Sequence, residues 1–199
     1  MKKTIQFLSI ITMVTVIGFG VTACDISTGG GDTFVPEYAV GNTGPGGGII
    51  VYISTVGFTV TGAGSFTAHY LEAAPANQGT SLAWASSSFT SIDIPGTGTA
   101  IGTGRANTAA ILAIDANAPA AKTCDEYSNN GKTDWFLPSA DELNAMFGAS
   151  SHLGNATGMF WSSSQDRVGY AYTQIFSGGV KTTTPKYHVN YNARAIRAF

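Results

Sequence analysis

The chain has 199 residues, of which 44% are hydrophobic, so a domain with a buried core is expected and wholesale disorder is excluded. Only 11% of the residues are charged, and glycine (25 residues), serine, threonine and asparagine take their place, which favours a loop-rich domain. The formal net charge of −2 excludes the basic surface that nucleic-acid binding requires.

Residues 1–23 have the pattern of a bacterial secretory signal peptide. Lys2 and Lys3 precede an apolar run that is too short and too early for a stable membrane span. Small residues then lead into Cys24, as in the lipobox at which lipoproteins are cut and acylated. We expect cleavage before Cys24 and a lipid on its thiol that anchors the protein to a bilayer. The alternative is an ordinary signal peptide followed by a chance cysteine.

Residues 24–37 are predicted to form a flexible tether, because they are rich in glycine, serine and threonine and lack periodicity. The folded domain is predicted over residues 38–199. Once Cys24 is acylated, Cys124 is the one remaining thiol, so no intramolecular disulfide can form. We expect Cys124 to pack as a small buried apolar side chain.

The first half of the domain predicts two strands. Ile49–Ile53 is a β-branched run after a glycine-rich turn, and residues 68–75 form a second run that Pro75 ends. Residues 81–104 are predicted to be irregular, because turn-forming residues dominate them.

Three helical segments follow, over residues 106–114, 118–127 and 138–147. In the last of them Ser139 and Glu142 have the spacing of a capping box. Strands are predicted again over residues 158–164 and 170–177, and over 187–199. Two to three helices enclosed between early and late strands predict an α+β fold with a mixed, mostly antiparallel sheet.

No motif in the sequence has the spacing of a catalytic or metal site. Gly96, Gly98, Gly102 and Gly104 do not form a phosphate loop, because Ile101 stands where the third glycine belongs, and loop glycines explain them better. The histidines lack metal-ligand spacing, and adjacent acidic residues on a helix diverge. We therefore expect a protein that is not an enzyme and has no metal or cofactor. The residues considered are His69, His152, His188, Ser151, Asp125, Glu126, Asp141 and Glu142.

The motifs GPGGGIIVY, YLEAAP, IGTGRANTAAILA, DWFLPSADELNAMF, FWSSS, AYTQIFSGG and ARAIRAF occur in the order found in a known family. On these motifs, about Gly44 to Phe199 resembles the DUF1566, or Lcl C-terminal, domain family. The resemblance implies a C-type-lectin-like fold and a relation to variable proteins of diversity-generating retroelements, some of which are surface lipoproteins. Formylglycine-generating enzymes share that fold but need a cysteine pair, which a chain that keeps only Cys124 as a free thiol cannot supply. The chain also lacks the Glu-Pro-Asn and Trp-Asn-Asp triplets of calcium-dependent sugar-binding lectins.

The same resemblance divides the C-terminal residues into scaffold and ligand-binding positions. It implies a scaffold of Trp161, Ser162, Ser163, Ser164, Ala171, Phe176, Gly178, Arg194, Ile196, Arg197 and Phe199. The positions implied for ligand binding are Asp166, Arg167, Tyr170, Tyr172, Gln174, Tyr187, His188, Asn190, Tyr191 and Asn192. Tyrosine with adaptable polar residues suits a binding surface, although tyrosine and threonine are also ordinary residues of a soluble strand.

We therefore expect a lipoprotein displayed at the outer membrane or cell surface that binds a protein or glycan ligand through its C-terminal face. The alternative is a structural or envelope-assembly module that uses the same face for a permanent protein partner. Trp135, Phe136 and Trp161 are expected in the core.

Overall fold

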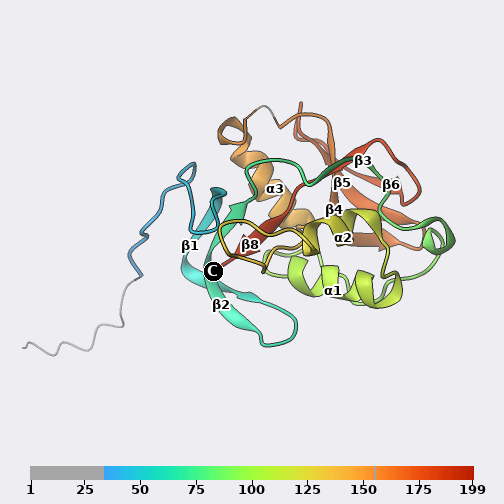
Figure 1. The fold of residues 1–199 in the computed structure, drawn as a ribbon, viewed down its shortest axis with the longest axis horizontal. Helices are drawn as coiled ribbons and strands as arrows, with labels where there is room; N and C mark the ends of the chain where they lie inside the picture. The colour runs from blue at the N-terminus through green and yellow to red at the C-terminus, as the bar shows by residue number, and fades with distance from the viewer. Residues whose placement is uncertain (1–33, 155) are drawn as a thin grey trace, which may run out of the picture. The chain divides into compact units, whose positions relative to one another are not determined.

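The computed structural model describes residues 34–154 and 156–199 as an α+β domain (Figure 1). Three α-helices accompany two mostly antiparallel sheets, which confirms the predicted fold class. The signal peptide, Cys24 and residues 24–33 of the predicted tether lie outside the described residues. Within the described ranges, no helix combines the length and apolar character needed to cross a bilayer.

A three-stranded antiparallel sheet has the order β1-β2-β8. It consists of β1 (Ile49–Val60), β2 (Phe66–Ala73) and β8 (Ile196–Ala198). β1 runs seven residues beyond its predicted end at Ile53, because it continues past an irregularity in its pairing with β2. Gly57 lies in that irregularity with φ of +78°, a conformation that glycine adopts without strain.

A five-stranded sheet has the order β3-β7-β4-β5-β6, and only β4 and β7 pair in parallel. Its strands are β3 (Gly79–Leu82), β4 (Met159–Arg167), β5 (Tyr170–Ile175), β6 (Lys181–Pro185) and β7 (Tyr191–Ala193). The sequence pattern does not predict β3 or β6. Both are short edge strands, and β6 ends in a proline, which an edge tolerates because no ladder donor is needed there.

All three predicted helices are present. They are α1 (Gly104–Ile114), α2 (Pro119–Asp125) and α3 (Ala140–Gly148). Two 3₁₀ turns, Ser87–Phe89 and Ser150–His152, accompany them. The capping box of α3 is confirmed: Glu142 N donates to Ser139 Oγ at 3.3 Å, and Ser139 N donates to Glu142 Oε2 at 2.7 Å.

The five-stranded sheet separates two hydrophobic clusters. Phe160 and Trp161 are neighbours in β4 and therefore point to opposite faces. Trp161 joins α1 and α2 in one cluster, whereas Phe160 joins α3 and strands of the other sheet in the second. Trp135, Phe136 and Trp161 are buried, which confirms that prediction. Cys124 is also buried, as expected, and burial raises the pKa of its thiol.

The residues predicted as one terminal strand, 187–199, form two strands in different sheets. β7 belongs to the five-stranded sheet and β8 to the other, so the chain crosses between them at Arg194. The buried Arg194 donates from Nε to Ala74 O at 2.7 Å and from Nη1 to Leu153 O at 3.1 Å. Arg197 then contacts Glu72 at 3.0 Å and Asp134 at 2.8 Å. These buried arginines hold the crossover in place.

The first described residues pack against the three-stranded sheet. The ring of Phe34 stacks on His69 with centroids 3.7 Å apart, and Glu37 N donates to the Tyr70 hydroxyl at 2.7 Å. The Tyr70 ring in turn stacks on Phe199 at 5.1 Å. Packing of the described chain thus begins at Phe34, within the segment predicted as tether.

Candidate functional site

Register in the five-stranded sheet distributes the predicted binding residues over its two faces. In the β4–β5 pair, Phe160 is opposite Gln174 and Trp161 is opposite Thr173. Side chains alternate along a strand, so Tyr170, Tyr172 and Gln174 lie on the Phe160 face. Tyr191 contacts Trp161 and therefore lies on the other face. Seven of the ten residues predicted as one face fall into two separate clusters.

The first, the arginine–tyrosine cluster, consists of Asp166, Arg167, Tyr170 and Tyr172. Arg167 forms an ion pair with Asp166, and its guanidinium lies 3.9 Å from the ring centre of Tyr170. Burial, followed by the charge of Asp166, raises the pKa of the Tyr172 hydroxyl. Much of the charge and hydrogen-bonding potential of this cluster is thus already satisfied by contacts among its own residues.

The second, the aromatic row, consists of Tyr187, His188 and Tyr191. Tyr187 stacks on His188 at 5.2 Å, His188 stacks on Tyr191 at 5.9 Å, and Tyr191 meets the buried Trp161 edge-on at 4.8 Å. Tyr187, at the outer end, is 63% exposed. Exposed rings are therefore held in position by a chain of contacts that reaches the core.

A hollow of about 260 Å³ lies beside the aromatic row. Methyl groups, a proline ring and Val189 make up most of its wall, and Val189 is itself 53% exposed. The lining residues are Ala83, Ala85, Ser86, Ser87, Thr90, Pro119, Tyr187 and Val189. An exposed tyrosine beside an apolar hollow is an arrangement typical of binding surfaces.

Lys186, which the sequence pattern does not single out, fixes the loop that carries the aromatic row. Its side chain is fully buried and donates from Nζ to Ile92 O at 2.8 Å and to Gln165 Oε1 at 2.5 Å. The ammonium also lies 4.5 Å from the ring centre of Trp84. Burial lowers its pKa to about 8. A lysine in a polar, turn-rich segment gives no local signal that it will be buried.

The backbone of Lys186 connects the two clusters. Lys186 N donates to Gly169 O at 2.9 Å, so the loop that begins with Tyr187 starts beside the turn between Arg167 and Tyr170. The loop that carries the aromatic row therefore begins next to the arginine–tyrosine cluster.

Three predicted residues lie outside the two clusters. Gln174 is only 1% exposed and donates to Asn144 Oδ1 of α3 at 2.9 Å, so its predicted place on the binding surface is wrong. Asn192 donates to Thr157 O at 3.1 Å on the opposite face from Tyr191. Asn190 is exposed in the loop of the aromatic row.

The glycine-rich loop before α1 uses its backbone donors internally. Gly98 N donates to Asn107 Oδ1 at 2.9 Å, and Gly102 N donates to Glu142 Oε1 at 2.8 Å. Burial raises the pKa of Glu142 to about 7, although backbone N–H donors of Ser139, Gly102 and Gly104 oppose the shift. The loop thus binds the protein's own side chains, as the loop-glycine interpretation expects.

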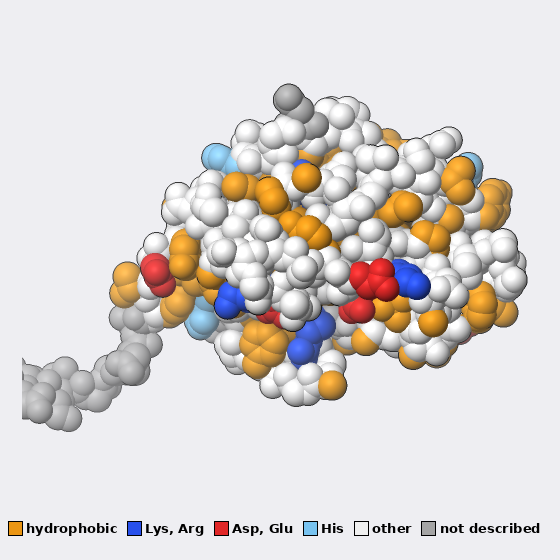
Figure 2. Space-filling view, in the orientation of Figure 1, with side chains coloured by type: hydrophobic (Ala, Val, Ile, Leu, Met, Phe, Trp, Pro, Cys, Tyr) orange, Lys and Arg blue, Asp and Glu red, His pale blue; other side chains and the backbone are white. Residues whose placement is uncertain are grey.

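Across residues 34–154 and 156–199, no three His, Cys, Asp or Glu side chains gather as metal ligands would. Charged side chains are few on the face drawn in Figure 2, where uncharged polar groups and backbone cover most of the surface. Charged groups therefore contribute little to the part of the surface drawn there.

No family model and no curated protein matches the chain. The resemblance to the Lcl C-terminal domain family therefore stays a prediction that rests on the motifs quoted above.

Proposed function

We propose that the protein is an exported, membrane-anchored lipoprotein that binds a protein or glycan ligand through the aromatic row. The observation that carries this proposal is the exposure of Tyr187 beside a hollow while its ring belongs to a stack that reaches Trp161. Tyrosine provides a large contact area and loses little rotamer freedom, so such residues supply much of the energy at binding surfaces.

The way the loop is held supports the same proposal. Lys186 fixes its backbone through contacts to Ile92, Gln165 and Gly169 before a ligand arrives. A surface that is ordered beforehand loses less conformational entropy on binding, which favours affinity. The arginine–tyrosine cluster, next to the same loop, supplies a second set of contacts.

Single alanine substitutions test the proposal. Tyr187→Ala and His188→Ala should weaken binding to cell-surface and matrix extracts about thirtyfold or more, since hot-spot residues contribute at least about 2 kcal/mol. Their melting temperatures should stay within a few degrees of the parent, because both side chains are exposed. Phe66→Ala, at a 39% exposed aromatic residue of the other sheet, is the matched control and should bind normally.

Alanine variants of Arg167, Tyr170 and Tyr172 then show whether the arginine–tyrosine cluster takes part. If every variant of both clusters binds and melts like the parent, the proposed site is incorrect. A stoichiometric protein complex that survives purification and dissociates only on unfolding would instead establish the assembly-module alternative.

The resemblance also leads to a prediction about the DNA downstream of the gene. If this copy is diversified, a near-copy of its last codons and a reverse transcriptase gene should lie downstream. Substitutions between related copies should then fall on the exposed residues of the two clusters and spare Gln174, which is buried.

A further inference from the structure

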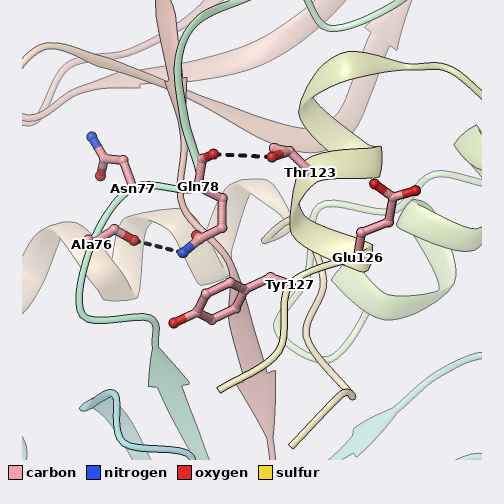
Figure 3. Close-up of a pocket in the computed structure, with 6 residues that line it drawn as sticks. All are labelled: Ala76, Asn77, Gln78, Thr123, Glu126 and Tyr127. Carbon is pink, nitrogen blue, oxygen red and sulfur yellow. Dashed lines mark hydrogen bonds between the residues drawn. The ribbon is translucent and has the colours of Figure 1, made fainter.

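A second hollow, larger than the one beside Tyr187, lies at the opposite end of α2. It measures about 440 Å³, within the range of roughly 300–1,000 Å³ that is usual for small-ligand sites. The turn after β2 and the C-terminal end of α2 form its walls, as Figure 3 shows. The lining residues are Ala76, Asn77, Gln78, Thr123, Glu126 and Tyr127.

Gln78 makes this wall rigid. Its backbone oxygen accepts from Thr123 Oγ1 at 3.1 Å, and its Nε2 donates to Ala76 O at 2.9 Å (Figure 3). Ala195 N donates to Gln78 Oε1 at 2.5 Å, and Gln78 N donates to Ala193 O at 2.9 Å. The turn is therefore fixed to α2 and to the crossover near Arg194, so the hollow is formed in advance.

Three groups at the hollow keep their hydrogen-bonding capacity. Within the described part of the chain, the Asn77 carboxamide and the Tyr127 hydroxyl have no hydrogen-bond partner. The Glu126 carboxylate has only Lys122, 3.9 Å away, and is 65% exposed. The Tyr127 ring is half-buried and packs edge-on against Trp135 at 5.1 Å. An aromatic ring with its hydroxyl, a free carboxamide and a carboxylate therefore line the same hollow.

The charges around the hollow disfavour a charged ligand of either sign. Glu126 would repel an anion. Behind Tyr127, the buried guanidinium of Arg194 has no ion pair among the described residues and acts to lower the pKa of the Tyr127 hydroxyl, which burial raises overall. The same positive charge disfavours an ammonium group over the Tyr127 ring. A neutral ligand with several hydroxyl groups avoids both penalties.

We propose that this hollow binds a neutral sugar residue by direct hydrogen bonds. A pyranose presents hydroxyl groups around its rim and C–H groups on its faces. The hydroxyls would donate to Glu126 and exchange hydrogen bonds with Asn77, while a C–H face packs against Tyr127. The site is separate from the aromatic row, so a negative result for sugar binding here would not contradict the proposed function, and the reverse also holds.

The test uses the isotopically labelled full chain in detergent micelles, titrated with methyl glucoside, methyl galactoside and methyl mannoside. Glucosamine and glucuronate serve as the cationic and anionic comparisons. At least one neutral glycoside should shift the amide signals of Gln78, Thr123 and Tyr127 saturably, and the charged sugars should bind more weakly.

Glu126→Ala should weaken that binding about tenfold, because it removes a hydrogen bond to a charged acceptor. Asn77→Ala should weaken it several-fold, and Glu37→Ala, the same change at a glutamate beside Tyr70, should leave it unchanged. Glu126 is exposed, so its variant should melt like the parent. Absent shifts, shifts confined to other residues, equal affinity in Glu126→Ala, or a preference for glucosamine or glucuronate would overturn the proposal.

Discussion

At the scale of single residues, Lys186 is the least expected feature of the domain. Its ammonium is buried against Trp84 and is neutralised by no carboxylate within ion-pair distance among the described residues. The negative charge of Asp93, whose Oδ1 accepts from Gln165 Nε2 at 2.5 Å, acts on the ammonium from beyond ion-pair distance and opposes part of the lowering of its pKa. Two acceptor oxygens and an aromatic ring compensate for part of the lost hydration.

This burial predicts a specific pH dependence of stability. The pKa of Lys186 is about 8 in the folded protein and 10.5 in its ordinary environment, so between these values the unfolded chain binds more protons. The free energy of unfolding should therefore rise with pH, by on the order of 1 kcal/mol between about pH 8 and 9.5. Urea unfolding should show this rise in the parent and not in Lys186→Met. Identical pH profiles for the two proteins would contradict it.

Cys24 and Cys124 allow a matched test of lipid attachment. Cys24→Ser should abolish palmitate incorporation, because acylation requires that thiol. Cys124→Ser should leave incorporation unchanged, since the Cys124 side chain is buried and burial raises its pKa. Metabolic labelling of both variants measures this, and label retained in Cys24→Ser would refute the lipoprotein prediction.

At the scale of elements, the start of α1 is closely packed against the start of α3. A Cβ added at Gly104 would overlap Glu142 Oε2 and lie 2.9 Å from Phe136 Cε2. Gly102 N already donates to the other oxygen of the same carboxylate. Glycine at position 104 thus lets the two helix starts share one buried glutamate.

Gly104→Ala should therefore destabilise the domain by roughly 1–3 kcal/mol, the usual effect of overpacking. Alanine in a helix normally stabilises by about 0.5–1 kcal/mol. Gly148→Ala, at the end of α3 with no atom within 4 Å of the added Cβ, is the control. In chemical denaturation, the midpoint should be lower than that of the parent only for Gly104→Ala. Equal midpoints for the two variants would show that the two helix starts adjust to the added methyl group.

β4 contributes side chains to both hydrophobic clusters, one from each face. Truncating its aromatic residues should therefore destabilise the domain. Trp161→Ala should cost about 3–5 kcal/mol and lower the melting temperature by roughly 10 °C. Tyr187→Ala, at the exposed end of the same aromatic stack, should change stability by about 0.5 kcal/mol or less. Thermal unfolding should be measured for both variants and the parent. An unchanged melting temperature in Trp161→Ala would show that the core tolerates the cavity.

Local signals explain which elements could be predicted. The capping box of α3, the isoleucines of α1 and the β-branched start of β1 are encoded by neighbouring residues. The resemblance placed Gln174 among the binding positions, but Asn144 of α3 contacts its side chain and helps to bury it. The division of residues 187–199 between two sheets and the burial of Lys186 also depend on tertiary contacts, which a local pattern does not contain.

At the scale of the whole domain, the two sheets have different roles. The three-stranded sheet receives both Phe34 and Phe199, which each contact the Tyr70 ring. The five-stranded sheet carries the aromatic row and the arginine–tyrosine cluster. In Figure 1 the described chain enters beside β1 and β2, while β5 and β6 lie at the other side of the domain.

The shared contact of Phe34 and Phe199 with Tyr70 also makes the domain suitable for circular permutation. Their rings lie 5.6 Å and 5.1 Å from that of Tyr70, so a short glycine-serine linker could join Phe199 to Phe34 without disturbing either sheet. New ends could then be opened in the exposed turn at Asn130 and Gly131. Such a rewired chain would keep the aromatic row in place while moving the point of attachment, so that ligand binding and surface display could be engineered separately.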